Sequence, residues 1–205
     1  GRKLSRFPTD PRIARMLITA IEEDSLCEVL VIPAGLTIQD PRERPVEKRQ
    51  AADEKHSVFK NENSDFLAYF NLWNWFQEQK RHLTRNKLRT LCKKNFISYL
   101  RMMEWEDIHK QLASQLKEMG HRTKPEAAEY AAIHRSLLTG LLGNIALKGD
   151  EREYLGARGK KLMIFPGSAL RKKRPRWVMA AELVETSQLF ARTAAKIEPE
   201  WIEDL

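Results

Sequence analysis

The sequence has little cysteine and no long apolar run. Cys27 and Cys92 are its 2 cysteines; they lie far apart, and no CxxC pair occurs. This excludes a disulfide-rich secreted scaffold and a cysteine-based zinc site, and it favours buried thiols in a reducing compartment. No run approaches the ~18 consecutive apolar residues of a membrane-spanning helix. We therefore expect a cytoplasmic protein without a membrane partner.

Signatures of independent catalysis are also missing. The 5 histidines occur singly, without HExxH, and neither GxSxG nor a DEAH tetrapeptide is present. The glycine-containing segment 156–161 departs from a Walker A motif in its glycine spacing and lacks a Ser or Thr after the lysine. We expect no catalytic residue, no metal and no cofactor in this chain, and no enzyme activity of its own. It begins with Gly1 rather than Met and has no apolar leader, so we expect an excised piece of a longer protein.

Positive charge is concentrated in two segments. Lys and Arg number 36 against 28 Asp and Glu, which gives a formal net charge of +8. Segments 79–94 and 158–176 contain many of these cations and no acid, so the rest of the chain is net acidic. A local basic footprint is typical of a surface that binds a polyanion such as nucleic acid. For each segment taken alone, a solvated loop remains the alternative.

Helix signals dominate the first two thirds of the chain. Asp10 before Pro11 is an N-cap followed by proline at the first helical position. Ser25 and Glu28 have the spacing of a capping box at the start of a second apolar run. We expect Pro33 to kink or end that second helix.

Aromatic residues follow Ser64, which we expect to cap another helix. They could form a platform for stacked bases, but their spacing favours a helix face buried in the core. Further helices are expected over 96–103, over 108–119 with an end at Gly120, and from Pro125 onward. The aromatic stripe consists of Phe66, Tyr69, Phe70, Trp73 and Phe76.

The pattern changes after about residue 143. Glycines become frequent, and apolar residues alternate over 177–183 and 189–197, with a shorter apolar run at 162–165. Alternation in short segments between turns predicts β-strands. The fold class is therefore α+β: a helical bundle over 1–125, then a small OB-fold-like β-barrel over 126–205 entered through a helix. We expect the basic stretch 171–175 to be a loop at the barrel rim, where OB-type barrels bind single strands.

Short motifs also follow one another in a recognisable order. They are LSRFPTDPR at 4–12, LTIQDP at 36–41, HSVF at 56–59 with SDFL at 64–67, NFI at 95–97, FPGS at 165–168 with WVMAAELVET at 177–186, and EW at 200–201. Together they resemble the region of DEAH-box RNA helicases that follows the motor, and they are most similar to the bacterial HrpA-type subgroup. The resemblance covers essentially the whole chain. Phe165 stands where many relatives have His, and Gly167 where they have Ser.

The resemblance implies which domains of a helicase this chain contains and which it lacks. The chain would be the tail of a winged helix, a ratchet-like helical (HA2) domain and an OB-fold. These would close over two RecA-like motor domains, absent from this chain, that bind ATP and magnesium and hydrolyse NTP. The parent would then be an ATP-dependent RNA helicase.

We therefore predict an accessory helicase region that contacts single-stranded RNA, mainly through phosphates. The alternative is a protein-docking module whose basic loops bind acidic surfaces of the motor or of a partner, without RNA contact. The predicted RNA-binding residues are Lys160, Lys161, Ser168, Arg171, Lys172, Lys173, Arg174 and Arg176, followed by Arg81, Arg85, Lys87 and Arg89.

Overall fold

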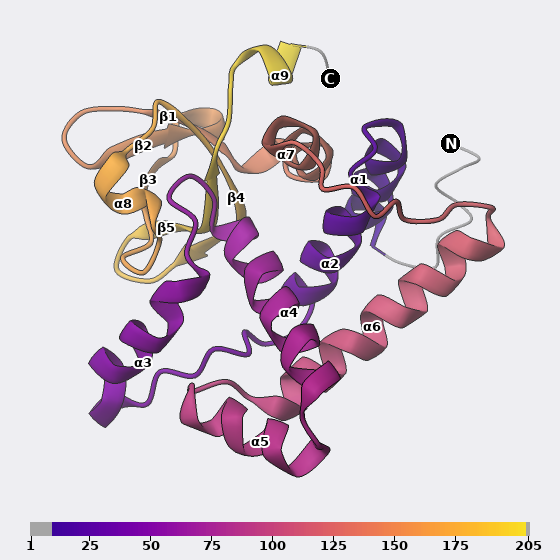
Figure 1. Cartoon of the computed structure of the whole chain (residues 1–205). Helices are drawn as coiled ribbons and strands as arrows, with labels where there is room; N and C mark the ends of the chain where they lie inside the picture. The colour runs from indigo at the N-terminus through magenta and orange to yellow at the C-terminus, as the bar shows by residue number, and fades with distance from the viewer. Residues whose placement is uncertain (1–9, 204–205) are drawn as a thin grey trace. The chain divides into compact units, whose positions relative to one another are not determined.

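A computed structural model describes residues 10–203 of the chain (Figure 1). The motif at 4–12 lies outside the described residues except for its last three positions. Among the helices described, none is both long and apolar enough to cross a membrane. The helices are α1 Pro11–Glu22, α2 Leu26–Leu36, α3 Arg49–His56, α4 Asp65–His82, α5 Arg85–Lys94, α6 Tyr99–Glu118, α7 Tyr130–Leu138, α8 Leu170–Lys173 and α9 Glu200–Glu203. The strands are β1 Ile145–Lys148, β2 Glu153–Gly156, β3 Lys161–Ile164, β4 Trp177–Glu185 and β5 Leu189–Lys196.

The chain forms two compact units. The described part of the first unit takes residues 10–29, 61–66 and 121–203, and the second takes Leu30–Lys60 and Leu67–Gly120. Helices α2 and α4 each contribute residues to both units. This division into two units does not test the domain boundary that we expect between residues 125 and 126, and that boundary stays a prediction.

The first unit contains a closed β-barrel with the strand order β1-β2-β3-β5-β4. All neighbouring strands are antiparallel except β3 and β5, which pair in parallel through Met163↔Phe190 and Ile164↔Ala191. Tyr154, Leu162 and Val178 lie in its core. This is the architecture of an OB-fold. The α+β fold class and the three predicted strands are confirmed, whereas β1 and β2 had not been located individually.

Helix α7 supplies the buried polar centre of the first unit. Its His134 is fully buried and stacks on Tyr130, with ring centroids 3.7 Å apart. Because the carbonyl oxygen of Tyr130 can only accept, His134 Nδ1 donates to it at 2.7 Å. The Ser64 hydroxyl then donates to His134 Nε2 at 2.6 Å. Burial lowers the pKa of His134 to about 4, so the imidazole is neutral in the folded protein.

The predicted capping box correctly locates the start of α2, but its two side chains form hydrogen bonds with other segments of the chain. Helix α2 does begin directly after Ser25. However, the Ser25 hydroxyl lies 3.0 Å from the Ser136 hydroxyl, and Glu28 accepts from the backbone N–H of Ala128 at 3.0 Å. Both side chains therefore join segments distant in sequence. The predicted Asp10 cap is confirmed, since its carboxylate accepts from the Arg12 N–H at 2.8 Å.

The second unit is built around Trp105 on α6. Its indole N–H donates to the Val31 carbonyl at 2.9 Å, and its ring packs against Tyr69 and Trp73 of α4. A Cβ on Gly35 would lie 2.5 Å from this ring, so only glycine fits there. Four members of the aromatic stripe are buried and Phe70 is half-buried, which confirms the core interpretation.

Several predicted helix limits are wrong. Helix α2 continues through Pro33 to Leu36, so the proline does not end it. The two helices expected over 96–103 and 108–119 are the single helix α6, on which Leu100 is 74% exposed. Helix α7 begins at Tyr130 rather than at Pro125. The predicted end at Gly120 is confirmed, because this residue has a φ of 86°, which glycine adopts without strain.

Candidate nucleic-acid interface

The second basic segment begins in the connection between β2 and β3. Lys160 is exposed, and Lys161 at the start of β3 pairs with Glu153 of the adjacent strand β2 at 2.9 Å. Just before them, Arg158 and Gly159 both have positive φ values, 59° and 69°. This turn directs the chain back into the sheet. OB-folds bind oligonucleotides on the face of their second and third strands, so Lys161 lies on the element that the fold normally uses.

The stretch 171–175 is not the expected loop at the barrel rim. Residues 170–173 form the short helix α8, which connects β3 to β4. Leu170 is fully buried and anchors it, while Arg171 and Lys172 are exposed. The position between two predicted strands suggested a loop, whereas residues 170–173 form one helical turn with Leu170 in the barrel core. The connections that OB-folds use for oligonucleotides are β1–β2 and β4–β5, and α8 belongs to neither.

Arg174 ends α8 in an unusual environment. Its φ of 47° is left-handed, and its N–H donates to the Leu170 carbonyl at 2.9 Å. The side-chain Nε and Nη2 atoms are buried without a hydrogen-bond partner among the described residues. The nearby Tyr154 hydroxyl donates instead to the Pro175 carbonyl at 2.7 Å. Burial raises the pKa of Tyr154 to about 12, an effect that the Arg174 charge opposes.

Ser168 has a partner within the first unit. Its hydroxyl donates to the carboxylate of Asp65, the first residue of α4. The same carboxylate accepts from the backbone N–H groups of Ala169 at 3.1 Å and Ala194 at 2.9 Å. Asp65 thereby ties the start of α8 to strand β5. Ser168 is thus placed by the fold, and its predicted RNA contact is not tested.

An aromatic group on the barrel was missed from the sequence. Phe165 and Phe190 meet edge to face with centroids 6.1 Å apart, and the Arg192 guanidinium lies 5.3 Å from the Phe165 ring centre. Phe190 and Arg192 occupy alternate positions of β5, on either side of the buried Ala191. Phe165 reaches them because its N–H donates to the Ala191 carbonyl across the β3–β5 pair, at 3.0 Å. The alternation along β5 is visible in the sequence and could have placed Phe190 and Arg192 on one face. The pairing of β5 with β3, which brings Phe165 to them, cannot be seen in the sequence.

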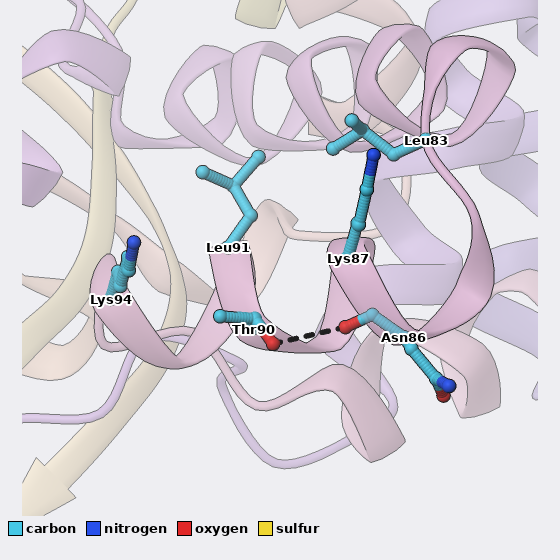
Figure 2. A pocket seen from close by; sticks show the side chains of 6 residues that line it. All are labelled: Leu83, Asn86, Lys87, Thr90, Leu91 and Lys94. Atoms are coloured by element: carbon cyan, nitrogen blue, oxygen red, sulfur yellow. Dashed lines mark hydrogen bonds between the residues drawn. The ribbon is translucent and has the colours of Figure 1, made fainter.

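The first basic segment lies in the second unit, on the end of α4 and on α5 (Figure 2). Arg81 pairs with Glu78 at 3.2 Å, and Arg89 lies 5.7 Å from the Tyr99 ring centre. Arg85 and Lys87 are exposed. The predicted residues therefore divide between the two units: 160–176 in the first and 81–89 in the second.

The described part of the chain offers no site for a metal ion, since no group of three or more His, Cys, Asp or Glu residues converges there. The buried cysteine Cys92 is a core residue, and burial raises the pKa of its thiol to about 11. The candidate site is thus one of cations and aromatic rings.

Two family models match the chain. Residues 10–95 match the helicase associated domain (HA2), ratchet-like, and residues 133–205 match the oligonucleotide/oligosaccharide-binding (OB)-fold. Fold and matches together define the class of protein: the ratchet-like and OB-fold region that accompanies a helicase motor.

Curated relatives narrow this class. The chain is 52% identical over 204 residues to the ATP-dependent RNA helicase HrpA of Escherichia coli and 51% identical over 206 residues to its homolog in Haemophilus influenzae. It is 28% identical to a pre-mRNA-splicing factor ATP-dependent RNA helicase of Schizosaccharomyces pombe. These alignments cover 99–100% of this chain but only 16–17% of each relative. The chain therefore corresponds to a C-terminal region of the HrpA-type DEAH-box helicases.

Proposed function

We propose that the chain is an accessory region of an ATP-dependent RNA helicase that contacts single-stranded RNA. In this proposal it closes over RecA-like motor domains, which bind ATP and magnesium and perform the hydrolysis. The relatives are RNA helicases by name, and together with the OB-fold match they support a role in an RNA-acting helicase.

The observation that carries the proposal is the unpaired charge around α8. Arg171, Lys172 and Arg176 are exposed, and no ion pair joins them to another residue in 10–203. Lys173 differs, since it pairs with Glu62 at 2.6 Å. Unpaired surface cations in an acid-free segment gain most from phosphate groups, because binding releases the counterions of the nucleic acid.

The aromatic group on the barrel adds a second kind of contact. Phe165 and Phe190 offer ring faces to unstacked bases, and Arg192 adds a cation beside them. Stacking tolerates any base, so the proposal expects weak sequence preference. Ser168 contributes less, because its hydroxyl already donates to Asp65.

Binding of a labelled single-stranded RNA oligonucleotide tests the proposal. With about four phosphate contacts, the logarithm of affinity should fall with the logarithm of salt concentration with a slope near −3. Reversing Arg171→Glu and Lys172→Glu together should weaken binding about tenfold at 0.15 M salt and flatten that slope. The matched control reverses Arg49→Glu and Lys55→Glu, two exposed cations of α3, and should change affinity less than about twofold. Salt-independent binding, or equal losses in both double variants, contradicts the proposal.

Protein docking is the second candidate, and one observation favours it. Lys161, Lys173 and Arg81 already take carboxylate partners within the chain, so these segments accept acidic side chains. The same α8 variant distinguishes the two functions when attachment to the motor domains is measured in the longer protein. Lost attachment with unchanged oligonucleotide binding would favour docking over RNA contact.

A further inference from the structure

Helix α5 carries an open groove that the proposed function does not use (Figure 2). Its volume is about 400 Å³, and all of it lies within the second unit. Figure 2 shows Lys87 and Leu91 projecting from the helix toward the side where Leu83 lies, in the turn before α5. The residues that line the groove are Leu83, Asn86, Lys87, Thr90, Leu91 and Lys94.

The spacing of these residues explains the groove. Lys87 and Leu91 are an i, i+4 pair on α5, and positions 86, 90 and 94 form the next i, i+4 row, whereas Leu83 lies just before the helix in the turn that follows α4. Leu88 and Cys92 point into the core, with 2% and 0% exposure. Leu91 therefore lies beside the buried face but remains half-buried, as does Leu83. The groove has two leucines along its floor.

The charged side chains that line the groove are all positive. The Thr90 hydroxyl is satisfied, because it donates to the Asn86 backbone carbonyl at 3.0 Å. Lys87 and Lys94 are exposed and form no ion pair with any residue between 10 and 203. No acid lies anywhere in segment 79–94. The groove thus combines an apolar floor with a cationic rim.

We propose that this groove docks an acidic amphipathic helix of a partner protein. Apolar side chains of that helix cover Leu83 and Leu91, and its carboxylates pair with Lys87 and Lys94. Helix-in-groove recognition uses such i, i+4 anchors, and complementary charge orients the incoming helix. RNA fits less well, because its phosphates leave the leucines uncovered and the lining has no aromatic ring on which a base could stack.

The proposal goes beyond RNA contact by the first unit and does not depend on it. It assigns Lys87 a protein partner in place of the predicted RNA contact. Arg81, Arg85 and Arg89 do not line the groove, so their predicted contacts are unaffected.

A labelled helical peptide provides the probe. It carries leucines at i, i+4 and i+8 with glutamates on both sides, and its binding to the full 205-residue chain is followed by fluorescence anisotropy at about 0.15 M salt, where long-range attraction is screened. The variant Lys87→Glu with Lys94→Glu should bind about tenfold more weakly. Arg85→Glu with Lys93→Glu changes the same charge on the same helix outside the groove, and should cost less than about threefold.

Leu91→Gln separates this proposal from simple charge attraction. It should weaken peptide binding about fivefold and leave oligonucleotide binding unchanged, with thermal unfolding confirming that the half-buried site still folds. Four results would overturn the proposal: no saturable peptide binding, equal losses in the two charge variants, equal binding of a leucine-free acidic peptide, or no effect of Leu91→Gln. If the groove charge variant instead loses only oligonucleotide binding, the face is a nucleic-acid surface. Oligonucleotide binding through α8 is measured in a separate experiment. Failure of the peptide-docking proposal can therefore be distinguished from failure of the RNA-contact proposal.

Discussion

The two basic segments have similar compositions but are presented by different means. Segment 158–176 is distributed over a turn, strand β3, the short helix α8 and a left-handed residue, and the carboxylate of Asp65 ties part of it to β5. Segment 79–94 lies largely on α5, which is anchored by the apolar side chains Leu88 and Cys92. Similar charge density is therefore supported by apolar burial alone in α5, and by a polar network together with the buried Leu170 in α8. The consequences of breaking each support should differ in size and in pH dependence.

The largest expected effect is on the apolar support. Leu88→Ala should lower the free energy of unfolding by about 3 kcal/mol, because it removes a side chain that is 2% exposed and leaves a cavity. Urea unfolding at neutral pH measures this. A loss under about 1 kcal/mol would mean that α5 is not held by this burial. Leu100→Ala, at a 74% exposed position, is the control and should cost under about 0.5 kcal/mol.

The polar support should be slightly less costly to remove. Asp65→Ala leaves the N–H groups of Ala169 and Ala194 and the Ser168 hydroxyl without their acceptor, and should cost about 2–3 kcal/mol in urea unfolding. Glu78→Ala removes only an exposed partner of Arg81 and should cost under about 0.5 kcal/mol. Equal losses in the two variants would remove the distinction between the segments.

Acid should weaken the first unit through His134. Its folded pKa is about 4 against 6.5 for a free histidine, so the unfolded chain binds the extra proton first as pH falls. Stability from this residue is complete above pH 6.5 and decreases between pH 6.5 and 4, by on the order of 2 kcal/mol. The difference in urea unfolding between pH 6.5 and 4.5 should shrink in His134→Gln. An unchanged difference would show that other groups cause the acid sensitivity.

The smallest effect concerns the surface of α5. Arg89→Ala removes the cation above the Tyr99 ring and should cost about 0.5 kcal/mol. Arg171→Ala on α8 has no such partner among the residues described and should change the free energy of unfolding by less than that. The two measurements show whether Arg89 on α5 contributes more to the free energy of unfolding than Arg171 on α8. A larger loss of stability for Arg171→Ala would contradict this prediction.

Local signals in the sequence were sufficient for part of this structure. The Asp10 cap, the aromatic stripe and the strands β4 and β5 each depend on neighbours within one element, and each prediction is confirmed. The alternation itself is interrupted, because three consecutive residues of β4, 178–180, and two of β5, 194–195, are buried. Helix α8 escaped prediction because a single turn beside prolines has almost no periodicity. Strands β1 and β2 were too short for an alternation to emerge.

Features that need distant partners could not be predicted. Ser25 and Glu28 have ideal capping spacing, but their actual partners lie about a hundred residues away. The grouping of Phe165 with Phe190 and Arg192 requires knowledge of the β3–β5 pair. The basic segments themselves were visible as composition, whereas the elements that present them were not.

Strands β3 and β5 close the barrel through a short parallel pairing, which we call the seam. Its register pairs are Met163↔Phe190 and Ile164↔Ala191, and the Phe165 N–H donates to the Ala191 carbonyl beside them, whereas β4 and β5 pair along most of their lengths. Amide hydrogens at this seam should therefore exchange with solvent before those of the β4–β5 hairpin. Phe165 and Arg192 lie across the seam from one another. In the proposed RNA complex, a base stacked beside this pair would bind only the closed barrel, so base binding and barrel closure would be thermodynamically linked.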